Sequence, residues 1–188
     1  CIANYLCKHI SNEKFPKYFS LEKLNDLRYG ENPHQSASIY KTTTKKRKSI
    51  VDSKLHQGKE LSYNNVVDGE AALSCVANFK DPSCVIVKHA NPCGVSSDKN
   101  LKQAYRNAYN TDPVSSFGGV IAFNRKIEKD LLEDILGNQF VELIIAPEFS
   151  DESIEFAKTK KNIRIIEYLE KYNSNSFNQI KSINNGIL

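Results

Sequence analysis

Short apolar runs alternate along the chain with segments whose apolar positions recur every three to four residues. The runs are the length of strands buried on both faces, and they occupy residues 84–87, 120–123, 143–146 and 163–166. The helical spacing occurs near residues 68–79, 101–108, 127–138 and 151–160. This repetition predicts an α/β fold with a layered, mixed or mostly parallel sheet flanked by helices.

The polar residues around these segments predict where the elements begin. We expect Asp68 to cap the first helix and Asp98 or Asn100 to cap the second. If much of the sheet is parallel, functional residues should lie just beyond the carboxyl ends of its strands.

The first residues differ from the rest. Residues 1–10 have the spacing of a helix end, and residues 11–26 are polar and aromatic, as in a connection. We therefore place a domain boundary at about residue 15, so that residues 1–15 end one domain and residues 16–188 form the next. The chain contains no Met and begins with Cys1, so we expect it to be a piece of a longer protein.

The amino-acid composition limits the kinds of partner and cellular compartment that fit this chain. The net charge of +4 arises from clusters such as residues 45–48, which favours solvated loops over a nucleic-acid partner. No apolar run approaches the ~20 residues that a membrane helix needs, and no secretory leader is visible, so we expect a cytoplasmic protein without a membrane partner. The five cysteines form no CxxC pair, which favours free thiols.

The segment VIVKHANPCG (85–94) carries the clearest chemistry. A buried strand ends in Lys88 and His89, and a turn there can direct both side chains into one cleft. Pro92 restricts the residue before it and Gly94 permits a positive φ, so the pair is held rigidly. A lysine at a strand end and a histidine bonded to the backbone are the structural alternative.

Zinc deaminases offer a second alternative, because their signature joins H-x-E to P-C-x-x-C. In this chain Asn91 stands at the position of the Glu, and Ser96 stands where the second Cys would follow Cys93. A catalytic zinc needs three protein ligands. We therefore expect no metal at this segment.

Three other segments combine polar, aromatic and glycine residues. RYGENPHQ (28–35) presents Arg28, a donor suited to phosphate, and Tyr29, which can stack on a heterocycle, although an ordinary loop explains it equally well. DPVSSFGG (112–119) has paired glycines that let the backbone approach a ligand. We expect GKELSYNN (58–65) only to support the first of these segments.

Taken in their order along the chain, and followed by QFVELIIAP (139–147), these segments resemble one family, the bifunctional purine-biosynthesis enzymes. The resemblance covers roughly residues 1–168 and implies the first half of the AICAR formyltransferase domain, preceded by the last helix of the IMP cyclohydrolase domain. It implies a fold similar to cytidine deaminases without zinc. It also implies a homodimer that uses 10-formyltetrahydrofolate as co-substrate.

The resemblance also implies roles for individual residues. Lys88 and His89 correspond to the catalytic pair, and the substrate-binding positions correspond to Arg28, Tyr29, Gly118 and Glu142. Leu143 follows Glu142 where some members have Gly. A neutral His89 suits the removal of a proton from the AICAR amine, and Lys88 suits stabilisation of an oxyanion.

The family pattern continues beyond this chain. We therefore expect the parent enzyme to transfer formyl to AICAR and to cyclise the product to IMP, and the 188-residue piece to be inactive alone. The alternative from a different functional class is a non-catalytic nucleotide-binding module with the same fold.

Overall fold

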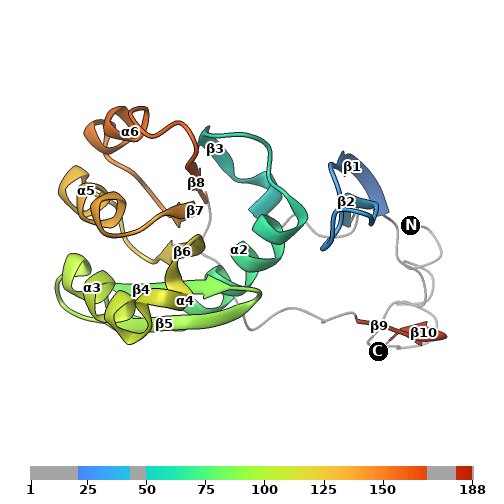
Figure 1. The fold of residues 1–188 in the computed structure, drawn as a ribbon, viewed down its shortest axis with the longest axis horizontal. Helices are drawn as coiled ribbons and strands as arrows, with labels where there is room; N and C mark the ends of the chain where they lie inside the picture. The colour runs from blue at the N-terminus through green and yellow to red at the C-terminus, as the bar shows by residue number, and fades with distance from the viewer. Residues whose placement is uncertain (1–20, 43–49, 169–180, 188) are drawn as a thin grey trace, which may run out of the picture.

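The computed structural model describes residues 21–42, 50–168 and 181–187, and within them a six-stranded sheet is the main element (Figure 1). Its order is β3-β8-β7-β6-β4-β5. The bounds are β3 (Lys54–Gln57), β4 (Ser83–Lys88), β5 (Asn91–Ser97), β6 (Gly119–Phe123), β7 (Val141–Ala146) and β8 (Arg164–Glu167). The β6–β7 and β7–β8 pairs are parallel, whereas β3–β8, β4–β6 and β4–β5 are antiparallel. The prediction of a mixed sheet is confirmed, and a mostly parallel one is wrong.

Helices cover both faces of this sheet, as Figure 1 shows. The 3₁₀ turn η1 (Ile50–Asp52) and α2 (Tyr63–Val76) lie on one face, where the buried apolar residues of α2 are Ala72, Leu73 and Val76. On the other face lie α3 (Leu101–Thr111), α5 (Lys129–Asn138) and α6 (Asp151–Ala157). The result is a layered α/β/α unit with apolar contacts on each side of the strands.

Apart from polar residues near their ends, the central strands are apolar because both of their faces are buried. Ile86, Ile121 and Ile144 are paired neighbours in β4, β6 and β7, and they face the cluster under α3 and α5. The alternate residues, among them Val87 and Val120, face α2. This period of two explains why a continuous apolar run in the sequence predicted each strand correctly.

The first helix begins before the predicted residue. Ser62 caps α2: its hydroxyl accepts a hydrogen bond from the backbone N–H of Asn65, and the Asn65 side chain accepts one from the backbone N–H of Ser62. This reciprocal capping box satisfies the donors that a helix start leaves open. The assignment of Asp68 as the cap is therefore wrong, because Asp68 lies inside α2. The prediction that Asn100 caps α3 is confirmed.

The segment after Lys88 is a strand as well as a turn. It forms β5, an edge strand in a hairpin with β4, and Pro92 is tolerated there at a register irregularity. Gly94 does not have the positive φ expected for it. Instead, a Cβ at Gly94 would lie 2.0 Å from the carbonyl oxygen of Ala108 in α3. Glycine is required here because helix and strand are in close contact.

Two short hairpins complete the described residues. One pairs β1 (Leu21–Leu27) with β2 (Ala37–Thr42), and the other pairs β9 (Ser182–Ile183) with β10 (Gly186–Ile187). The expectation that residues 11–26 are a simple connection is wrong from residue 21 onward, where β1 begins. The predicted helix in residues 1–10 and the domain boundary near residue 15 lie outside the described residues.

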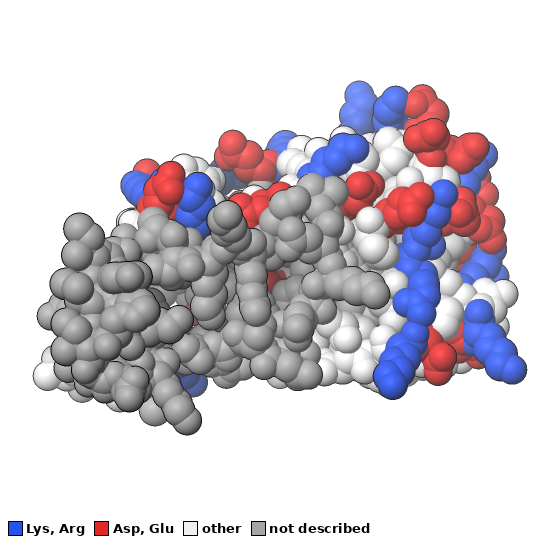
Figure 2. Space-filling view, turned by 180° about the vertical axis from the view of Figure 1, so that it is seen from behind, with Lys and Arg blue, Asp and Glu red and all other residues white. Residues whose placement is uncertain are grey.

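Charges of both signs are distributed over the described surface. On the face shown in Figure 2, basic and acidic side chains are interspersed over the upper and right parts of the described surface. Several charges form pairs, for example Arg106 with Asp134 at 2.8 Å and Lys129 with Glu133 at 3.4 Å. None of the helices in the described ranges combines the length and apolar character needed to cross a bilayer.

The contact at Gly94 gives a test of the fold. We predict that Gly94→Ala lowers the free energy of unfolding by about 1–3 kcal/mol or more, because the methyl group displaces α3 from β5. The matched control is Gly137→Ala in α5, where a Cβ meets nothing within 4 Å and alanine favours the helix. Urea unfolding measures both changes. Equal midpoints for Gly94→Ala and the wild-type protein would contradict this packing.

Candidate functional site

The turn between β4 and β5 presents the residues that the sequence analysis emphasised. Lys88 pairs with Asn91, which leaves His89 and Ala90 as a two-residue loop. Their φ angles are 52° and 58°, the pattern of a type I′ turn that normally selects Asn-Gly. A residue with a Cβ in this region carries a strain of about 1–3 kcal/mol, which persists only where the surroundings impose it.

The main chain of this turn is held from two sides. The Asp68 carboxylate accepts hydrogen bonds from the backbone N–H groups of His89 at 3.3 Å and Ala90 at 2.7 Å. The Asn91 side chain donates to the carbonyl oxygen of His89 at 2.7 Å. The imidazole itself belongs to an exposed residue, so His89 is not a core histidine. Sequence analysis missed this role of Asp68, because a helical Asp signals no distant partner.

Lys88 extends to the segment before β6. Its ammonium group donates a hydrogen bond to the backbone carbonyl of Phe117. Gly118 follows with φ +70°, and a Cβ built on it would lie 3.7 Å from the Lys88 Nζ. The backbone N–H of Gly118 donates to the carbonyl oxygen of Phe140 at 2.8 Å. The structure therefore brings together Lys88 and Gly118, which are thirty residues apart in sequence.

Glu142 lies nearby at the start of β7. It is half-buried, and its carboxylate accepts a hydrogen bond from the Asn65 side chain at 3.0 Å. Asn65 is 2% exposed and also completes the capping box of α2. One helix thus contacts both the β4–β5 turn, through Asp68, and Glu142, through Asn65.

The sheet edge that carries these residues differs from the one expected. Because β4 runs antiparallel to β6, the carboxyl end of β4 lies beside the amino ends of β6 and β7. Lys88 follows the expected rule for strand ends, but Gly118 and Glu142 precede or begin their strands. These two candidate residues therefore do not lie beyond the carboxyl ends of strands, as a mostly parallel sheet would have placed them.

Arg28 and Tyr29 are not joined to this group. They follow β1, where the Arg28 guanidinium carbon lies 5.9 Å from the centre of the Tyr29 ring. In the described part of the chain, no hydrogen bond or ion pair connects either residue to Lys88, His89, Gly118 or Glu142. The Asn64 side chain donates to the carbonyl oxygen of Glu31 at 3.4 Å, a contact that fits the supporting role expected for residues 58–65.

Cys93 is poorly suited to act as a nucleophile. Burial raises the pKa of its thiol, and the negative charge of Asp112 raises it further, so the protonated form is favoured at neutral pH. The thiol donates to the carbonyl oxygen of Ser115 at 3.6 Å. Across residues 21–42, 50–168 and 181–187, no group of three or more His, Cys, Asp or Glu side chains gathers as metal ligands would.

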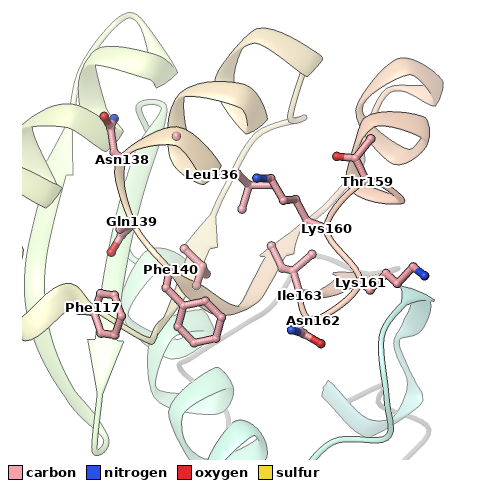
Figure 3. Close-up of a pocket in the computed structure, with 12 residues that line it drawn as sticks. Phe117, Leu136, Asn138, Gln139, Phe140, Thr159, Lys160, Lys161, Asn162 and Ile163 are labelled. Carbon is pink, nitrogen blue, oxygen red and sulfur yellow. The ribbon is translucent and has the colours of Figure 1, made fainter.

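Figure 3 shows the lining of a cavity of about 610 Å³. It is connected to the site through Phe117, whose carbonyl accepts the hydrogen bond from Lys88. Phe117 and Phe140 line it, and their ring centres are 5.7 Å apart. Lys160, Lys161 and Asn162 contribute from the loop before β8. Sequence analysis did not assign these residues to a site, because lysines in a polar loop resemble any solvated surface.

The whole sequence can be compared with known protein families. The family described as "AICARFT/IMPCHase bienzyme" matches residues 1–188 of this chain. The chain belongs to the AICARFT/IMPCHase bienzyme family. This confirms the family resemblance identified from the five sequence segments.

A curated member of the family shows how much of such a protein the chain represents. The chain is 43% identical over 192 residues to the bifunctional purine biosynthesis protein PurH of Caldicellulosiruptor saccharolyticus. The match covers 100% of this chain and 37% of that protein. The chain therefore spans well under half the length of this relative.

Two solved structures are distantly similar to this chain. RibD of Acinetobacter baumannii (form 1) has a TM-score of 0.37 and 14% identity, covering 54% of this chain and 33% of RibD. A putative formate dehydrogenase accessory protein from Desulfotalea psychrophila has a TM-score of 0.45 and 6% identity, covering 83% of this chain and 94% of that one. TM-scores of 0.37 and 0.45 do not establish a shared fold, so the likeness to cytidine deaminases stays a prediction.

Asn65 gives a test of the architecture behind the site. We predict that Asn65→Ala lowers the free energy of unfolding by about 1–3 kcal/mol, because it removes the capping box and leaves Glu142 without its amide donor. Asn64→Ala is the matched control, because Asn64 makes one long hydrogen bond at 3.4 Å. Urea unfolding of the two variants measures the difference. A smaller loss for Asn65→Ala than for Asn64→Ala would contradict this role.

Proposed function

We propose that this chain supplies part of an AICAR formyltransferase active site in purine biosynthesis. In this proposal the formyl donor is 10-formyltetrahydrofolate, the acceptor is the 5-amino group of AICAR, and no metal takes part. Membership of the AICARFT/IMPCHase family and the 43% identity to PurH support it. The chain acts within a protein of about the relative's length, which also cyclises the product to IMP, and the 188 residues alone are inactive.

His89 is the proton acceptor in this mechanism. As the AICAR nitrogen attacks the formyl carbon, a new C–N bond forms and the bond to the folate nitrogen breaks. The amine loses one proton to His89, and the leaving folate nitrogen gains one. A base must lie within hydrogen-bond reach of that amine. His89 is exposed at a clamped turn, so its imidazole can meet a ligand without leaving a core position.

Lys88 stabilises the charge that develops on the formyl oxygen. An ammonium group has three N–H donors, and one of them bonds to the Phe117 carbonyl. That bond fixes the position of the nitrogen and leaves two donors for an oxyanion. A preorganised cation at such a position commonly contributes a rate factor on the order of 10²–10³.

Gly118 and Glu142 bind the nucleotide in this proposal. Gly118 lies beside Lys88 and has no side chain to block a ligand. The Glu142 carboxylate is held by Asn65 and can accept hydrogen bonds from amino groups of the substrate. Arg28 and Tyr29 also bind substrate in this proposal, and the full-length protein is a homodimer.

One observation carries the proposal. The antiparallel pairing of β4 with β6 brings the Lys88 ammonium beside Gly118, at the end of the sheet where His89 is exposed. Both the cation and the imidazole are therefore available at the same edge as an open glycine backbone.

We predict that His89→Ala and Lys88→Ala in the full-length protein each lower kcat for formyl transfer by roughly 10²-fold or more. Lys129→Gln, on α5 and exposed, should retain wild-type activity. The assay follows tetrahydrofolate release with AICAR and 10-formyltetrahydrofolate, and circular dichroism checks the fold.

The possible results separate the two functional classes. Normal turnover by correctly folded His89→Ala removes that residue from the mechanism. AICAR binding by the wild-type protein without any formyl transfer supports the non-catalytic nucleotide-binding module instead.

A further inference from the structure

The β4–β5 turn adopts a conformation that its own residues do not favour. His89 and Ala90 both have positive φ angles, at 52° and 58°, although neither is Gly or Asn. A type I′ turn with these residues needs contacts from outside the hairpin to stay in place. The question is which group supplies those contacts.

Asp68 supplies the principal ones. One carboxylate oxygen accepts from the Ala90 N–H at 2.7 Å, and the other accepts from the His89 N–H at 3.3 Å. Hydrogen bonds to an ionised acceptor are stronger than those between neutral groups. Two successive N–H groups directed at one carboxylate fix the orientation of two peptide planes, and therefore the direction in which the His89 side chain leaves the turn.

The carboxylate is itself fixed by α2. Gly69, the next residue, is buried against the sheet so closely that a Cβ there would lie 2.3 Å from the Cδ1 of Ile50 and 3.1 Å from the Cδ1 of Ile145. Ala72 and Leu73 continue the same buried face of the helix. Asp68 therefore projects from a rigid element that cannot follow the turn if the turn moves.

We propose that Asp68 is a positioning residue for the reacting pair, holding His89 in its strained turn so that its imidazole lies at the same edge as the Lys88 ammonium. This inference rests on the proposed formyltransferase function. Asp68 forms hydrogen bonds with the main chain of the turn, and these bonds are present in the free protein, before substrate binds. It should therefore influence kcat far more than the KM for either substrate.

The decisive variants are Asp68→Asn and Ala90→Gly in the full-length protein. Asparagine keeps the size of the side chain but places an NH₂ group against one of the two backbone N–H groups. We expect kcat to fall about 10–100-fold, with KM for AICAR and for the folate changed less than threefold. Asp130→Asn, an exposed carboxylate on α5, is the matched control and should leave both constants unchanged.

Rescue distinguishes positioning from a general loss of structure. Glycine adopts positive φ without strain, so the kcat of Asp68→Asn/Ala90→Gly should be at least fivefold higher than that of Asp68→Asn. Wild-type kcat in Asp68→Asn would overturn the proposal. So would a double variant that remains as slow as Asp68→Asn, or a loss that appears in KM rather than kcat. If Asp68→Asn does not fold, the double variant is compared with Ala90→Gly, and a kcat more than about twentyfold lower overturns the proposal.

A measurement independent of catalysis separates this inference from the proposed function. Hydrogen exchange of the His89 and Ala90 amides should be at least tenfold faster in Asp68→Asn than in the wild-type protein, whether or not formyl transfer occurs. Unchanged exchange overturns the clamp even if the enzyme is active. Conversely, an inactive wild-type protein with faster exchange in Asp68→Asn refutes the formyltransferase proposal but not the clamp.

Discussion

The antiparallel placement of β4 between β5 and β6 is the constraint on which the rest of the site depends. It turns the carboxyl end of β4 toward the amino ends of β6 and β7, so Lys88 meets the Phe117–Gly118 backbone and lies near the start of β7. A parallel β4 would place Lys88 at the opposite edge of the sheet. The layers above and below serve this arrangement, because α2 contacts the turn through Asp68 and the start of β7 through Asn65.

The sequence predicts those parts of the fold that depend on local patterns. Short, largely apolar runs identify β4, β6, β7 and β8, because the parts of a strand that are buried on both faces exclude most polar residues. Asn100 is recognisable as a helix cap because capping is a short-range hydrogen bond. Strand direction is different, because it is set by pairing between distant segments. The apolar run at residues 84–87 does not indicate whether the strand will pair parallel or antiparallel with its neighbours.

Positions whose role depends on a distant partner could not be predicted. The polar, proline-containing edge strand β5 has no apolar run, and Gly94 is needed because of the Ala108 carbonyl in α3. Asp68 has the sequence signature of a cap, yet its partners are two amides about twenty residues away. The residues of the candidate site were identified by the family motifs, while the groups that hold them in place became visible only in the folded structure.

Protection of Lys88 by the nucleotide is the most direct test of the central claim that this sheet edge is the substrate site. The full-length protein is labelled with an amine-reactive acylating reagent with and without AICAR, and the rate at each lysine is measured by mass spectrometry. If AICAR binds at this edge, it should slow labelling of Lys88 at least fivefold and leave the labelling rate of the exposed Lys129 unchanged. Equal labelling rates at Lys88 with saturating AICAR would contradict the claim.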